Sequence, residues 1–89
     1  MTDEELLEEV KKRLGITGTY LDDVINGHIQ DVKDFMSDAG VSDDVLQSRA
    51  SIGAVTRGVS DLWDSGSGKC EFSPYFIQRV TQLTYKGGR

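Results

Sequence analysis

The chain has 89 residues, of which 28% are charged and 37% hydrophobic, and its formal net charge is −5 at pH 7. This length predicts a single domain over residues 1–89, and no apolar run approaches the roughly 20 residues that cross a membrane. The acidic balance disfavours stable nucleic-acid binding, because a negative surface repels phosphate backbones. It is compatible with a surface that passes close to DNA without binding it.

The residues that most often carry chemistry are scarce. One cysteine, Cys70, and one histidine, His28, are too few for a zinc site or an internal disulfide. His28 falls among the apolar residues of a predicted helix and no nucleophile motif accompanies it, so we interpret it as structural. The acidic N-terminus has no signal-peptide pattern. We therefore expect no enzymatic activity, no metal, no cofactor and a protein kept in a cytoplasm.

The first predicted helix starts at a capping box formed by Thr2 and Glu5 and ends at Gly15, which suits the left-handed conformation. Its leading half is strongly acidic. These carboxylates could form a solvated helix face or a surface that binds a basic partner. The candidate interface residues taken from this helix are Glu5, Glu8 and Glu9.

A second helix is predicted from Leu21 to Ala39, because apolar residues recur in steps of three and four over five turns. Asn26-Gly27 lies inside it and favours a turn locally, but the apolar stripe keeps its phase across this pair. We therefore predict one continuous helix, with no more than a bend at Asn26-Gly27. Gly40 then serves as its C-cap.

The third predicted helix begins at the N-cap Ser42 and continues without a break to the end of the apolar stripe at Trp63. It contains several small residues. Two glycines inside a helix cost about 2 kcal/mol together unless they permit a close helix contact, so we predict a groove for another helix. The small residues are Ala50, Gly53, Ala54 and Gly58.

The Gly-rich segment after this helix ends in Gly68-Lys69 and partly resembles a phosphate-binding loop. Trp63 stands where the first glycine of such a loop belongs, and Cys70 stands where the magnesium-binding hydroxyl belongs. We therefore predict no nucleotide site and interpret the segment as a helix-helix connector.

The fourth predicted helix has Ser73 as its N-cap and Pro74 at its first position. Phe72 and Ile77 occupy the two positions of a hydrophobic staple, so we predict contact between them. These four helices together predict an all-α fold, a small bundle of four helices joined by short loops.

Eight residues are predicted to form the core, and Trp63 is predicted to be an anchor between the third and fourth helices. Arg57 and Arg79 lie among apolar residues on core-facing helices, where they could pair across helices or across subunits. We favour the subunit pairing and add both, with Lys69, to the candidate interface. The predicted core residues are Val32, Phe35, Val55, Val59, Leu62, Trp63, Phe72 and Phe76.

Three segments of the chain are similar to a known family. They read LLEEVKKRLGI, DDVINGHIQDVKDFMSDAGV and RGVSDLWDSGSGKCEFSPYFIQRVTQL. They resemble the head-tail connector family of tailed bacteriophages and prophages, also called adaptor or head completion proteins. The most specific part runs from Arg57-Gly58-Val59 through Leu62-Trp63 and a Gly-rich loop to Phe72-Ser73-Pro74-Tyr75-Phe76.

This resemblance implies a small helical bundle that self-associates into a ring, commonly of about a dozen copies. The ring would lie beneath the phage portal protein, extend the DNA channel and dock a tail-side stopper or completion protein. DNA would pass through without specific binding, and no membrane would be involved. The implied location is the head-tail junction of the virion, after assembly in the host bacterial cytoplasm.

A second class of function is a small acidic helical regulatory protein of helix-turn-helix type, with Gly40 as the turn. The net charge of −5 argues against it. The residues that would read DNA, Val45, Leu46 and Gln47, also offer a poor base-reading face.

Overall fold

The computed structural model describes residues 2–64 and 72–86, and every regular element in this part of the chain is helical. The all-α prediction is thereby confirmed, and the four longer helices correspond to the four predicted ones. A short helix and a 3-10 turn, η1, occupy the first part of the predicted third helix. The elements are α1 Asp3–Leu14, α2 Asp22–Asp38, α3 Asp43–Leu46, η1 Arg49–Ser51, α4 Ile52–Asp64 and α5 Pro74–Lys86.

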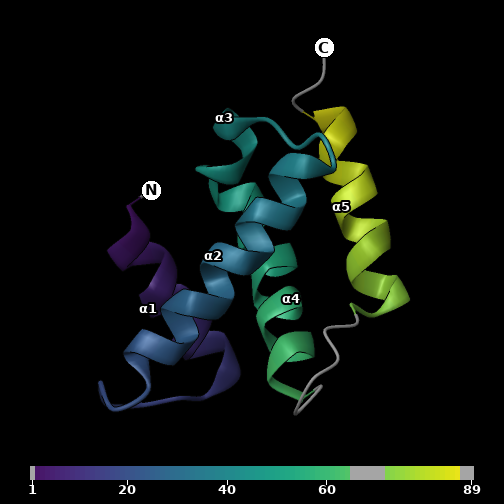
Figure 1. Cartoon of the computed structure of the whole chain (residues 1–89). Helices are drawn as coiled ribbons and strands as arrows, with labels where there is room; N and C mark the ends of the chain where they lie inside the picture. The colour runs from purple at the N-terminus through teal and green to yellow at the C-terminus, as the bar shows by residue number, and fades with distance from the viewer. Residues whose placement is uncertain (1, 65–71, 87–89) are drawn as a thin grey trace.

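The helices are arranged with α2 and α4 in the middle, packed against each other (Figure 1). Helix α1 contacts both of them on one side, and α5 packs on α4 on the other side. The molecule measures 40 × 28 × 17 Å along its principal axes. The first and last helices therefore lie at opposite edges of a flattened bundle.

Both ends of α1 form as the sequence predicts. The Thr2 hydroxyl accepts a hydrogen bond from the Glu5 N–H at 3.1 Å, and the Glu5 carboxylate accepts one from the Thr2 N–H at 2.8 Å. Gly15 closes the helix at φ 74°, and the Ile16 N–H donates to the Lys11 carbonyl at 2.9 Å. These are the bonds of a capping box and a Schellman C-cap.

Helix α2 runs without interruption through Asn26-Gly27, which confirms the prediction of one helix. It ends in a second Schellman arrangement, with Gly40 at φ 106° and the Val41 N–H bonded to the Met36 carbonyl at 3.0 Å. Val41 is buried, so the turn leads directly back into the core.

The prediction of one unbroken third helix is wrong. Ser42 does cap a helix, but α3 ends at Leu46, and Ser48 is extended at φ −92° and ψ 163° before the chain winds again. Serine side chains stabilise this break by bonding to backbone groups that a continuous helix would pair. The Ser48 hydroxyl donates to the Val45 carbonyl at 2.8 Å, and the Ser51 hydroxyl donates to the Leu46 carbonyl at 3.0 Å.

The groove of small residues is confirmed at Gly58. A Cβ added there would lie 2.7 Å from Cε1 of Phe76 and 2.8 Å from Cγ2 of Val32, so α2 and α5 approach α4 closely at this point. Gly53 takes no part, because an added Cβ would meet no atom within 4 Å. Among the predicted core residues, those that are buried are Val32, Val55, Val59, Leu62 and Phe76.

Two core predictions need correction. Trp63 is 40% exposed and contacts His28 edge to face, with 5.9 Å between ring centroids, because Leu62 takes the core position at the end of α4. The predicted staple between Phe72 and Ile77 is also wrong. Phe72 and Phe35 are partly buried and pack on Phe76 instead, while Ile77 is 40% exposed.

Candidate subunit interface

The outer side of α1 carries Glu4, Glu5, Glu8 and Glu9, which we call the acidic face. Together with Arg49 of η1, these residues line a shallow depression on the surface. Glu4, Glu5 and Glu8 are exposed, and Glu9 is partly buried. The amphipathic spacing explains this placement, since Leu6, Leu7 and Val10 occupy the opposite, core-facing side of the helix.

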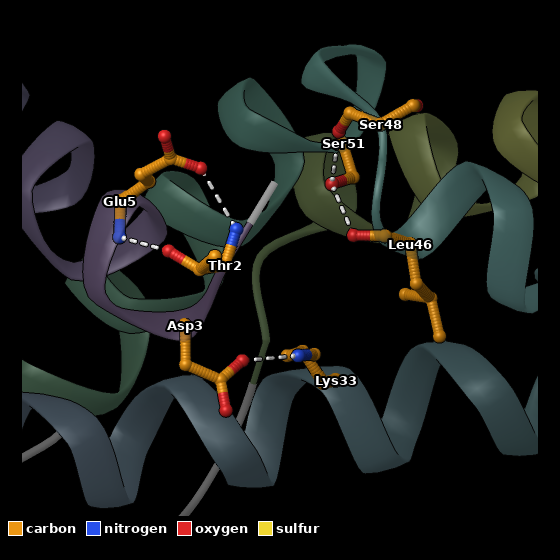
Figure 2. A network of polar contacts seen from close by, with 7 residues as sticks. All are labelled: Thr2, Asp3, Glu5, Lys33, Leu46, Ser48 and Ser51. Carbon is orange, nitrogen blue, oxygen red and sulfur yellow. Dashed lines mark hydrogen bonds and ion pairs between the residues drawn. The ribbon is translucent and has the colours of Figure 1, made fainter.

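Ion pairs hold the acidic face in place. Lys33 of α2 lies 3.2 Å from Asp3, and Arg49 lies 3.8 Å from Glu9 (Figure 2 shows the first of these pairs). The hydrogen bond from the Thr2 N–H lowers the pKa of the Glu5 carboxyl, so Glu5 stays charged well into the acidic range. The face is therefore negative, with ion pairs to α2 at the start of α1 and to η1 at Glu9.

Lys11, on the inner side of α1, is only 5% exposed. Its ammonium group lies 2.7 Å from Asp22 Oδ1 and donates a hydrogen bond to the Gly18 carbonyl. The pair gives no signal in the sequence, where both residues look like ordinary charges on a helix surface. The pair fixes the α1–α2 loop against α1 and leaves the outer carboxylates without this cation.

The start of α5 is tied to α4 through Asp61. One carboxylate oxygen of Asp61 accepts from both the N–H and the hydroxyl of Ser73, each at 2.9 Å. The Ser73 hydroxyl in turn accepts from the Phe76 N–H at 3.2 Å, as the predicted N-cap does. Arg57 lies 3.3 Å from Asp61, so its guanidinium completes the network.

The surface of α5 carries Tyr75, Arg79 and Tyr85, which we call the basic-aromatic face, and of these Arg79 is partly buried. Tyr75 is 57% exposed and Tyr85 is 74% exposed. The sequence of α5 contains no aspartate or glutamate. Arg79 donates to the Gln82 side chain at 2.8 Å and has no carboxylate within ion-pair distance among the described residues.

Four of the candidate interface residues from the sequence lie on opposite edges of the molecule. Glu5, Glu8 and Glu9 share the acidic face, whereas Arg79 lies on α5. Arg57 is partly engaged within the chain, through Asp61 and through the face of Tyr75 at 5.7 Å. Lys69 lies outside the described residues.

Within residues 2–64 and 72–86, no group of three or more His, Cys, Asp or Glu side chains could hold a metal ion. None of the helices in this part of the chain combines the length and apolarity that a membrane span requires. What these side chains offer is charge of two signs and exposed aromatic rings. Such surfaces are typical of protein-protein contacts.

The sequence model of one protein family matches residues 4–86, and this family is described as phage gp6-like head-tail connector protein. The matched range spans both the acidic face and the basic-aromatic face. No curated protein and no solved structure gives a significant match to the chain.

Proposed function

Because the chain belongs to the phage gp6-like head-tail connector proteins, we propose that it forms a ring beneath the portal, extends the DNA channel and docks the next tail component. Its role as a structural connector follows from the family. The observation that supports a ring is the placement of two surfaces of opposite charge on opposite edges of one flattened molecule (Figure 1).

A ring requires a heterologous interface, in which one patch of each copy meets a different patch of the next. The acidic face on α1 and the basic-aromatic face on α5 are two such patches. Closure makes many weak contacts cooperative, so each contact can be too weak to persist in a dilute solution. We therefore expect a monomer or weak oligomer when the protein is dilute, and a closed ring on the portal or at high concentration.

The charge of the chain suits a channel that conducts DNA. With a net charge of −5, the surface as a whole repels phosphate backbones and does not retain the passing duplex. This property fits a connector that DNA crosses without specific binding.

The alternative function, a helix-turn-helix regulator, fits the structure poorly. The helix after the Gly40 turn, α3, has four residues and opens with Asp43 and Asp44. A recognition helix places its N-terminal residues against the bases, where these carboxylates would be repelled by the phosphates. A gel shift on random DNA at low salt tests this directly: we expect no shift, and a clear shift would favour the regulator.

Light scattering across a concentration series, with and without the portal protein of the same phage, tests the ring. We expect the molar mass to rise to a fixed multiple of the monomer and then to stay constant, with the portal lowering the concentration required. A twofold dimer of constant size that ignores the portal would contradict the proposal.

A further inference from the structure

The basic-aromatic face of α5 carries more apolar surface than folding alone explains. Tyr75 and Tyr85 of this face are two of the large hydrophobic residues that remain exposed in the described part of the chain. Tyrosine and arginine are enriched among residues that dominate protein-protein binding. A helix whose inner side already fills the core with Phe76, and whose outer side also carries such residues, has a surface suited to a partner.

Contacts within the chain position Tyr75 and the start of α5 before any partner binds. The guanidinium of Arg57 lies over the ring of Tyr75 at 5.7 Å from its centroid, and Asp61 fixes Ser73 at the start of α5. A preformed surface loses little conformational entropy on binding, so its contacts contribute more to affinity.

The acidic face of α1 contains carboxylates that lack a cation partner among the described residues. Glu4 and Glu8 are one helical turn apart and have no cation within ion-pair distance among the described residues. Like charges at this spacing destabilise a helix. A cation supplied from outside the molecule would relieve this repulsion.

From these two surfaces we infer that the basic-aromatic face of α5 binds the acidic face of α1 on a second copy of this chain, with Arg79 between Glu4 and Glu8. This inference rests on the proposed ring and names the surfaces that build it. The two faces carry opposite charges, and Arg79 has no carboxylate within ion-pair distance among the described residues. Charge complementarity of this kind steers partners and fixes their register.

The positions of α1 and α5 allow the same contact to repeat from one copy to the next. Because α2 and α4 separate α1 from α5, the two faces lie at opposite edges of the molecule (Figure 1). Each copy that uses its α5 still has a free α1, and the reverse is also true. Such an interface generates a ring when the rotation between copies closes.

Charge reversal tests the pairing. Glu8→Lys places a cation against Arg79, and Arg79→Glu places an anion against Glu4 and Glu8. We expect each variant to need at least a roughly tenfold higher concentration than the unmodified protein for half-maximal assembly in light scattering. A mixture of the two variants should assemble again, because alternating copies present Lys against Glu at one junction and Glu8 against Arg79 at the next.

Matched controls change the same charge elsewhere. Asp31→Lys on α2 and Arg13→Glu on α1 alter exposed residues outside both faces and should assemble like the unmodified protein. Circular dichroism confirms that each variant is folded. If the unmodified protein assembles and both reversals assemble equally well, or if the mixture fails to recover, the inferred contact is wrong while the ring stands. If the unmodified protein never assembles, the ring itself is wrong and the contact with it.

Discussion

Asp61 on α4 and Ser73 at the start of α5 are joined by two hydrogen bonds to the same carboxylate oxygen, each 2.9 Å long. The bonds link two helices across residues 65–71 and fix the orientation of α5. Since the Ser73 hydroxyl also caps α5, the carboxylate supports both the cap and the angle between the helices.

Replacing Asp61 with alanine removes this support. We expect Asp61→Ala to lower the free energy of unfolding by about 1 to 2 kcal/mol, because the Ser73 N–H loses its acceptor and Arg57 loses its carboxylate partner. Urea unfolding followed by circular dichroism measures the change. The control Asp31→Ala alters an exposed aspartate and should shift stability by no more than about 0.5 kcal/mol. Equal effects in the two variants would show that the network contributes nothing.

Two glycines test the close packing of α4. Gly58→Ala should destabilise the protein by about 1 to 3 kcal/mol, because the new methyl group collides with Phe76 and Val32. Gly27→Ala should instead stabilise by up to about 1 kcal/mol, since an added Cβ there meets open space in the middle of a helix. Thermal melting distinguishes the signs. A stabilising Gly58→Ala would mean that α5 does not pack on α4 at this point.

Trp63 and Phe76 give a second comparison. Phe76 is fully buried, so Phe76→Ala should cost about 3 to 5 kcal/mol. Trp63 is 40% exposed, and Trp63→Ala should cost less than half as much. Guanidinium unfolding of both variants provides the test. A Trp63→Ala variant as unstable as Phe76→Ala would place the indole back in the core.

The buried Lys11 predicts a third stability effect. Asp22→Ala leaves the ammonium group with the Gly18 carbonyl as its remaining acceptor in the described structure, and we expect a loss of about 1 to 3 kcal/mol. Asp23→Ala, at the neighbouring exposed position, is the matched control and should have little effect. If both variants melt at the same temperature, the Lys11 charge does not depend on Asp22.

Periodicity and capping residues were sufficient to predict much of this fold. Thr2, Gly15, Gly40, Ser42 and Ser73 mark helix ends in the structure as they do in the sequence, because their local bonds depend on few other residues. The break after Leu46 was missed, since the apolar spacing continues across it while Ser48 and Ser51 compete for the backbone.

Contacts between helices were harder to predict from the sequence. Leu62 and Trp63 both fit the apolar stripe of α4, and only the packing of the other helices around α4 decides which of the two is buried. The acidic face was visible in the sequence because its glutamates are close together in the chain. The Lys11–Asp22 pair and the Asp61–Ser73 bonds join residues 11 or 12 positions apart, where sequence spacing gives no signal.

The contact between α1 and α5 of neighbouring copies is tested most directly by cross-linking. In a Cys70→Ser background, we would combine Lys12→Cys, one helical turn from Glu8, with Gln82→Cys, one helical turn from Arg79, because both positions are exposed and the inferred ion pairs stay intact. The protein, at high concentration with portal added, is then treated with a flexible bismaleimide. We expect a denaturing gel to show a ladder of covalent multimers that ends at the ring, and no ladder for either single-cysteine variant. A double variant that yields only dimers, or no more product than the single variants, would contradict the account.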